Sequence, residues 1–266
     1  MCNMTATIPT ATTLVLDFLT AVTDRKMSAQ RLCEAGSVLG YSEATMRVAI
    51  TRLVQQGKIL KLERGWYSPN AQRNRLQLDV ENWRERADWI VPWNGGWIAV
   101  HEGAINRQDK TALRQHQRAL KLRGFQKWNS GLYLRPDNLQ GGVEALRAEL
   151  AELGVAKGAQ LFVATEFDPG QAAELRQLWD IPALRRDYAK MLSRLVASKR
   201  RLKKLDLSAA GRESLLVGRE LIGQMLRDPL LPAEMVRGQD YRELAQIIAE
   251  YQDFSREIWN RVFSGA

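Results

Sequence analysis

The chain has 266 residues, of which 45% are hydrophobic and 26% charged, so it is too apolar for a disordered protein and long enough for two or three domains. Its formal net charge is +9 and its isoelectric point is near 9.8, which favours a polyanionic partner. No segment approaches the roughly 18 consecutive apolar residues of a membrane span, so we expect no membrane association.

The N-terminal residues contain an apolar run that resembles a targeting segment in length only. It lacks the basic start of a signal peptide, and Asp17 and Asp24 interrupt or flank it, so an amphipathic helix is the better interpretation. The two cysteines, Cys2 and Cys33, lack zinc-site spacing and cannot form a disulfide framework in a chain this long. These features predict a cytoplasmic protein.

Three short helices are predicted first, one ending near residue 22 and the others covering about 29–38 and 43–56. Each begins with a hydroxyl side chain that can act as an N-cap: Thr12 or Thr13, Ser28, and Ser42. The third helix has an apolar face with the i, i+3, i+4, i+7 spacing of an amphipathic helix, formed by Met46, Ala49, Ile50 and Leu53.

A short hairpin is predicted immediately after the third helix. Gly57 ends the helix, KILKLE (58–63) alternates as a strand, and WYS (66–68) returns after a tight turn. Three helices and such a hairpin predict a winged helix-turn-helix over residues 1–70. In that module the third helix enters the major groove of DNA, and the hairpin touches the backbone or the neighbouring groove.

The outward face of the third helix is small and basic, which suits DNA better than the protein contacts that other winged helices make. The predicted DNA-binding residues are Ser42, Thr45, Arg47, Thr51, Arg52, Lys58, Lys61 and Arg64. Arg47 is the main candidate for base recognition, because Arg can bind O6 and N7 of guanine together. For Arg52, a phosphate contact or a structural salt bridge ranks above base recognition. An ion pair with Glu43 or another acid is the structural alternative for either arginine, and capping alone would explain Ser42.

A charged connecting helix (71–92) leads to a predicted middle domain (93–168). Strands and helices alternate there, with strand-like segments in 95–103, 125–136 and 159–167 and helices at about 109–123 and 141–153. This β-α-β-α-β order fits a small ferredoxin-like sandwich, of which one strand is not placed.

Residues 169–266 are helical throughout and predict a C-terminal helical domain, with breaks at Pro182, Gly211 and 228–232. The fold class is therefore α+β, with a winged helix-turn-helix, a ferredoxin-like middle domain and a helical end.

Four stretches resemble, in their order and spacing, the PaaX family of bacterial repressors of phenylacetate-degradation operons. They are MRVAITRLVQQGKI with RGWY (46–67), WNGGW (93–97), RALKLRGFQKWNSGLYLRP (118–136) and LRDPLLP (226–232). The resemblance implies the same three-part fold, a homodimer on a palindromic double-stranded DNA operator, and release by phenylacetyl-CoA or another aryl- or acyl-CoA thioester. The segment 233–246 departs from the family, which usually has a Trp-Gly segment there, so the effector can differ.

Most of the positive charge lies outside the predicted DNA-binding domain. Residues 107–135 contain eight Lys or Arg against one Asp, and residues 185–204 contain nine against one. Those of the first stretch include Arg107, Lys110, Arg114, Arg118, Lys121, Arg123 and Lys127. Three interpretations of the stretch 107–135 remain: it can be a solvated helix face, it can widen the DNA footprint, or it can bind the phosphates of coenzyme A. For the second stretch a solvated helix end is the default.

An effector site near the first basic stretch would need cations and an aromatic wall. Its candidate residues are Trp97, Arg114, Arg118 and Trp128. For each of these tryptophans, packing in the core is the more frequent role.

No residue pattern supports catalysis or a resident cofactor. His101 and His116 have no third ligand in view, and Glu102 is a poor substitute for the acid of ferredoxin-fold nucleases. The predicted function is a sequence-specific transcriptional repressor of an aromatic-acid catabolic operon, without enzymatic activity or a metal. The alternatives are a nuclease targeted by its winged helix, and an architectural nucleic-acid-binding protein without an effector.

Overall fold

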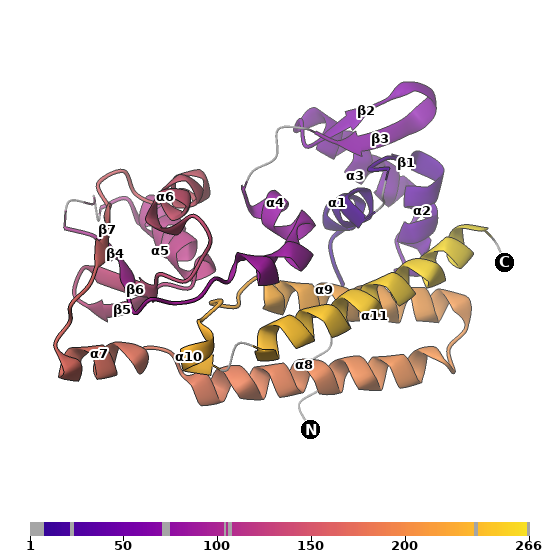
Figure 1. The fold of residues 1–266 in the computed structure, drawn as a ribbon. Coiled ribbons are helices and arrows are strands. Elements are labelled where there is room, and N and C mark those ends of the chain that lie inside the picture. The colour runs from indigo at the N-terminus through magenta and orange to yellow at the C-terminus, as the bar shows by residue number, and fades with distance from the viewer. Residues whose placement is uncertain are drawn as a thin grey trace. The chain divides into compact units, whose positions relative to one another are not determined.

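The computed structural model shows a mixed α+β protein with two small antiparallel sheets and long C-terminal helices (Figure 1). It describes residues 8–21, 24–70, 75–103, 105, 108–236 and 239–264, except for the side chains of Arg64, Gln239 and Asp240. Two compact units are present. The first unit consists of residues 1–73, 194–221 and 250–266, and the second unit consists of residues 74–193 and 222–249.

The first unit begins with three helices and three short strands. They are α1 (Ala11–Ala21), β1 (Met27–Ser28), α2 (Ala29–Val38), α3 (Glu43–Gln55), β2 (Ile59–Lys61), the 3-10 turn η1 (Glu63–Gly65) and β3 (Trp66–Pro69). The predicted caps Ser28 and Ser42 are confirmed, since each side chain accepts a backbone hydrogen bond from three residues on. The prediction for α1 was wrong: Thr13 N donates to Thr10 Oγ1 at 3.2 Å, so the cap is Thr10 rather than Thr12 or Thr13. The end predicted for this first helix, near residue 22, lies outside the described residues.

The strands of the first unit form a sheet of order β1-β3-β2. The central strand β3 pairs antiparallel with β2, with Ile59 opposite Pro69, and with β1, with Met27 opposite Tyr67. Gly65 at the hairpin tip has φ of 77°, a conformation that glycine adopts without strain. The predicted hairpin is present, and β1 adds a third strand that the sequence pattern did not indicate.

The N-terminal helices share one hydrophobic core, which the C-terminal end of α11 (Gln239–Ser264) completes. The inward faces of α1, α2 and α3 supply Leu14, Phe18, Leu19, Leu32, Met46, Ala49, Ile50 and Leu53, of which the last four are the apolar face predicted for the third helix. Phe18 meets Trp259 edge to face with the ring centroids 4.6 Å apart, and Trp259 also packs against Phe263. The compact unit that contains residues 1–70 therefore includes side chains from the far end of the chain.

Three long helices, α8 (Ile181–Leu202), α9 (Leu207–Met225) and α11, contribute residues to both compact units. The helical character predicted for residues 169–266 is confirmed, but this region does not form one separate compact unit. The predicted break at Gly211 was wrong, because Gly211 lies inside α9. A Cβ atom at Gly211 would lie 3.5 Å from the side chains of Trp259 and Val262, which is ordinary van der Waals contact, so α9 and α11 pack here at a distance that does not require glycine.

Polar pairs also join helices of the first unit to one another. Ser198 Oγ and Tyr251 Oη form a buried hydrogen bond of 2.7 Å, and Arg219 pairs with Asp17 of α1. No helix in the described part of the chain has the length and apolar character needed to cross a membrane.

The second unit contains a four-stranded sheet and the remaining short helices. They are α4 (Arg75–Glu81), the 3-10 segment η2 (Trp83–Trp89), β4 (Trp97–His101), α5 (Lys110–Leu122), β5 (Gln126–Asn129), β6 (Leu132–Pro136), α6 (Gly142–Leu153), β7 (Gln160–Ala164), α7 (Pro169–Arg176) and α10 (Ala233–Val236). The sheet has the order β5-β6-β4-β7, with every neighbouring pair antiparallel. Segment 125–136 thus holds two strands, and the second of them supplies the strand that the sequence analysis did not place.

The core of the second unit is rich in tryptophan. Trp97 on the central strand β4 stacks on Trp179, with centroids 6.0 Å apart and planes at 19°, and meets Trp93 edge to face. Trp97 is only 2% exposed. Its role is packing, which is the structural alternative given for it above.

Candidate nucleic-acid interface

The face of α3 that carries the predicted DNA contacts is turned to solvent. The opposite face is buried in the core of the first unit, so helix geometry directs Thr45, Arg47, Thr51 and Arg52 outward. Seven of the eight predicted residues are exposed, on α3, its N-cap and the adjoining hairpin: Ser42, Thr45, Arg47, Thr51, Arg52, Lys58 and Lys61. The side chain of Arg64 lies outside the described part of the chain.

The hydroxyl groups on this face are mainly engaged within the helix. Ser42 Oγ accepts from Thr45 N at 3.2 Å and lies 2.9 Å from Thr45 Oγ1. Thr51 Oγ1 donates to the carbonyl oxygen of Arg47 at 2.9 Å. A hydroxyl has a single hydrogen, so Thr51 can donate to a DNA phosphate only by giving up this bond.

Arg47 forms an ion pair with Glu43, one turn earlier on α3. Arg47 Nη2 lies 2.6 Å and Nε 2.7 Å from Glu43 Oε1, and the two side chains are 59% and 64% exposed. The hydrogen bond and charge of Glu43 raise the pKa of the Arg47 guanidinium. The structural alternative predicted for this arginine is therefore present in the free protein.

Three other cations of the interface have no such partner. The side chains of Arg52, Lys58 and Lys61 are exposed and make no ion pair or hydrogen bond with any residue that the structure describes. The structural salt bridge considered for Arg52 is thus not formed within the described residues. Unpaired surface cations gain most from phosphate contacts, because they give up no protein partner on binding.

Val48 is an apolar residue on this face to which the sequence analysis assigned no role. It is 68% exposed at the centre of the outward surface of α3, one turn after Ala44 and one turn before Arg52. The signal available in the sequence was a β-branched apolar residue on the polar side of an amphipathic helix. Such a side chain can contact the methyl group of thymine.

The basic stretch 107–135 separates into two classes of residue. Lys110, Arg114 and Arg118 form an exposed row on α5, spaced four residues apart, and none of them pairs with a described residue. Arg123 and Arg135, in contrast, are buried in the second unit. Arg107 lies outside the described residues. The predicted effector candidates Arg114 and Arg118 are therefore accessible, whereas buried Trp97 cannot form an open ligand wall.

Trp128, the other aromatic candidate, is half-buried. Its Nε1 donates to Glu174 Oε1 at 3.1 Å, and its ring meets Phe167 edge to face. Trp128 is also packed against the hydrophobic cluster that contains Trp97, so the structure places the two tryptophans in one core, where packing accounts for both.

A pocket of about 230 Å3 in the second unit was not predicted. It is lined by Arg75, Trp89, Leu139, Gln140, Gly141, Ala145, Leu146 and Glu149. The guanidinium of Arg75 lies over the Trp89 ring, 6.0 Å from its centroid. The pocket is smaller than the roughly 300–1,000 Å3 of drug-sized ligand sites, so it suits a small group.

Four of the nine cations in the basic stretch 185–204 form ion pairs with described residues: Arg186, Lys190, Arg194 and Arg201. Arg194 bonds Glu220 at 3.2 Å, and Arg201 pairs with Glu213. Lys190 lies 3.0 Å from Asp187. Of the others, Lys199, Arg200, Lys203 and Lys204 lie at the end of α8 or just after it, which agrees with the solvated helix end expected for this stretch, and Arg185 is exposed near its start.

Glu102, the acid nearest the end of β4, is buried in a hydrogen-bonded pair. His116 Nδ1 accepts from Ala156 N at 3.1 Å, so Nε2 carries the proton and donates to Glu102 Oε1 at 2.9 Å. In the described part of the chain no group of three or more His, Cys, Asp or Glu side chains could hold a metal ion.

Comparisons with known proteins bear on the fold of the chain. No family model matches the chain, and no curated protein matches it. Among solved structures it is similar to the uncharacterized protein Rv0674 from Mycobacterium tuberculosis, with 23% sequence identity and a TM-score of 0.60. The match covers 93% of this chain and 99% of that one. A likeness at this identity shows that the two chains share a fold.

Proposed function

We propose that the protein is a DNA-binding transcriptional regulator that acts in the cytoplasm. In this proposal the segment from α1 to β3 is a winged helix-turn-helix, α3 is its recognition helix, and the β2-β3 hairpin is the wing. The observation that carries the proposal is the exposed face of α3 beside unpaired cations at Arg52, Lys58 and Lys61. Cations without protein partners, on a helix narrow enough for the major groove, are suited to a duplex.

In the proposed winged helix, α3 and the β2-β3 hairpin form one rigid part. Leu53 near the end of α3 and Ile59 at the start of β2 are both buried in the same core. Recognition helix and wing therefore move together, and a change in the angle between two protomers would shift both contacts at once.

The architecture of the second unit supports the resemblance to PaaX repressors. The connectivity from β4 to β7 is β-α-β-β-α-β, and the order β5-β6-β4-β7 fits the split βαβ of a ferredoxin-like domain. We infer from the resemblance that the protein binds a palindromic operator as a homodimer and represses an aromatic-acid catabolic operon. An aryl- or acyl-CoA thioester would release it.

Three continuous helices connect the unit in which the effector is proposed to bind with the unit that is proposed to bind DNA. Because α8, α9 and α11 have residues in both compact units, a ligand in the second unit can bias the first through them. A coupling free energy of about 1–3 kcal/mol would change operator affinity about 5–150-fold.

The acyl group of the effector is better suited to the pocket beside Trp89 than to the predicted wall of Trp97 and Trp128. The pocket has an aromatic wall and room for a small acyl or aryl group, but not for a whole coenzyme A. Phosphates of the coenzyme would need exposed cations, and the α5 row with Arg114 and Arg118 provides them.

Fluorescence anisotropy tests the proposal. The full chain is titrated against the palindromic duplex upstream of its own gene, at fixed salt with random duplex as competitor, and then with a panel of acyl- and aryl-CoA thioesters. Specific binding that one thioester reverses supports the repressor. Specific binding that no thioester reverses would support a DNA-binding regulator and argue against a thioester as its effector.

The exposed row on α5 favours a second candidate, an architectural protein that binds nucleic acid without an effector. That function predicts affinity that falls steeply with salt and shows little sequence preference. Charge reversal at Arg114 and Arg118 separates the two candidates. It should abolish the thioester response of a repressor and leave operator binding intact, whereas it should weaken all DNA binding of an architectural protein.

A further inference from the structure

The pocket of about 230 Å3 in the second unit has both aromatic and aliphatic walls. Trp89 ends η2, and its backbone oxygen accepts from Gln140 N at 2.8 Å, which holds the loop after β6 against it. Leu139 of this loop and Leu146 of α6 are buried and line the pocket as well. An indole ring together with branched aliphatic side chains suits an aromatic ring as the ligand.

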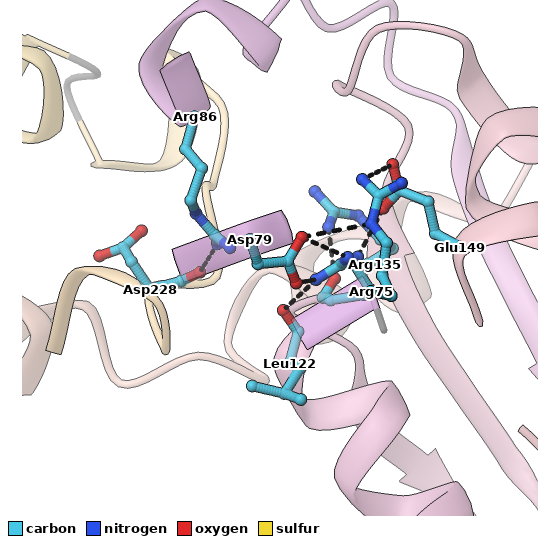
Figure 2. A network of polar contacts seen from close by, with 8 residues as sticks. Arg75, Asp79, Arg86, Leu122, Arg135, Glu149 and Asp228 are labelled. Atoms are coloured by element: carbon cyan, nitrogen blue, oxygen red, sulfur yellow. Dashed lines mark hydrogen bonds and ion pairs between the residues drawn. The ribbon is translucent and has the colours of Figure 1, made fainter. Parts of the chain in front are cut away.

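The polar part of this pocket is an ion pair between Arg75 of α4 and Glu149 of α6 (Figure 2). Arg75 Nη2 donates to Glu149 Oε1 at 2.8 Å, and Arg75 Nε donates to Asp79 Oδ1 at 3.2 Å. Arg75 Nη1 has no hydrogen-bond partner among the described residues, so its two N–H groups are available. Glu149 Oε2 accepts from Arg123 Nε at 2.5 Å, and each carboxylate oxygen can accept a second hydrogen bond. A donor and an acceptor therefore lie next to each other in the wall.

The charges of this wall balance one another without a ligand. Arg75 and Arg123 are both bound to the same two acids, Asp79 and Glu149. An anionic ligand would place a second negative charge beside the Glu149 carboxylate, and a cationic ligand would place a second positive charge beside Arg75. A neutral group that both accepts and donates a hydrogen bond avoids both costs. A hydroxyl group does this with a single oxygen atom.

We propose that this pocket binds a neutral aromatic ring that carries a hydroxyl group. The ring stacks on Trp89 and packs against Leu139 and Leu146, while the hydroxyl accepts from Arg75 Nη1 and donates to Glu149. The inference rests on the proposed function in one respect, which is the role of this ring as the acyl part of the effector. A hydroxyaryl thioester is then preferred over the thioester with an unsubstituted ring.

Isothermal titration calorimetry of the full chain without DNA tests the site. The probes are 4-hydroxyphenylacetamide and phenylacetamide, which differ only in the hydroxyl group. Both are neutral at pH 7, because a phenol has a pKa of about 10. The hydroxylated probe should bind about tenfold or more tightly, since its hydroxyl gains hydrogen bonds to two charged groups. Equal affinities, or no binding of either probe, would overturn the proposal.

Two variants separate binding of the ring from recognition of its hydroxyl. Arg75→Met should bring the ratio of the two affinities close to one, and a general loss of stability does not affect a ratio measured within one protein. Ala145→Leu fills part of the pocket and leaves the ion pair intact, so it should abolish binding of both probes. Ala148→Leu, at an exposed position of α6, is the matched control and should bind both as the unchanged protein does. A tenfold ratio that persists in Arg75→Met, or unchanged binding in Ala145→Leu, would contradict the site.

The calorimetric result and the DNA-binding result can fail separately. A chain that binds the hydroxylated probe but no specific duplex would retain the ring site and lose the proposed function. A chain that binds its operator but shows no preference for the hydroxyl would retain the regulator and lose this inference. In the anisotropy titration, 4-hydroxyphenylacetyl-CoA should release the operator at about one tenth of the concentration that phenylacetyl-CoA requires. Equal concentrations would contradict the role of the hydroxyl in the effector.

Discussion

On α3, the guanidinium of Arg47 holds the carboxylate of Glu43 from the preceding turn, with Nη2 2.6 Å from Oε1. Both side chains are more than half exposed, so the pair adds little to the free energy of unfolding. Its importance lies in binding, because Arg47 must share or release Glu43 before it can reach a base. Arg52, five residues further along α3, has no such partner among the described residues.

Replacing the two arginines should therefore affect DNA binding in different ways. Arg47→Ala should reduce the preference for the operator over a single-base variant by about 1–3 kcal/mol, because a guanine contact is lost. Arg52→Ala should weaken binding to all duplexes and reduce the salt dependence by about one phosphate contact. Anisotropy titrations at several salt concentrations measure both. A uniform loss for Arg47→Ala would make it a phosphate contact.

Glu43→Gln should strengthen DNA binding several-fold. The change removes a negative charge from the proposed DNA-facing surface and frees Arg47, and it keeps the side-chain volume. Stability should fall by no more than about 1 kcal/mol, which is the range for an acid in the first turn of a helix. Urea denaturation provides that control. Unchanged or weaker DNA binding would contradict the orientation of α3.

Val48 should read the methyl group of a thymine. Replacing that thymine by uracil removes one methyl group, which is worth about 0.8 kcal/mol or roughly a fourfold loss of affinity. In Val48→Ala the same replacement should have little effect, because the partner of the methyl group is gone. Equal sensitivity to uracil in both proteins would exclude the contact.

Asp79→Asn should destabilise the second unit severely. Asp79 is 2% exposed and accepts two hydrogen bonds from Arg123, so the change leaves a buried cation poorly paired. The expected cost is about 3–5 kcal/mol. Glu144→Gln, which breaks the exposed pair with Arg147 on α6, is the matched control and should change stability by less than about 1 kcal/mol. Urea denaturation followed by tryptophan fluorescence measures both variants.

Stability should decline in alkaline solution through Tyr251. Burial raises the pKa of Tyr251 from 10 to about 12, so above pH 10 the unfolded chain loses a proton that the folded chain retains. The stabilisation is therefore complete below pH 10 and is lost between about pH 10 and 12. Tyr251→Phe should be less stable at pH 8, because the bond to Ser198 is missing, and the deficit should narrow as the pH approaches 12. A constant deficit across this range would contradict the assigned shift.

Local signals in the sequence were sufficient for the helices and caps of the first unit. Ser42 has a hydroxyl at the right place, the inward positions of α3 follow the 3.6-residue period, and Gly57 marks its end. Boundaries were less certain, as Thr10 shows, because several neighbouring hydroxyl side chains can serve as the cap.

Contacts between distant segments could not be predicted. Trp259 completes a core that begins with Phe18, and no local pattern joins positions so far apart in the sequence. Charge counting failed for a related reason. Arg123 and Arg135 looked like surface cations in a basic stretch, but they are buried, and Arg123 pairs there with acids from α4 and α6.

The most direct test of the central claim is selection of bound duplexes from a random pool, followed by anisotropy on the enriched sequence. The proposed regulator should enrich a palindrome with two half-sites and bind it at least about a thousandfold more tightly than random duplex at the same salt concentration. A pool without an enriched sequence, and a ratio of affinities near one, would contradict sequence-specific recognition by α3.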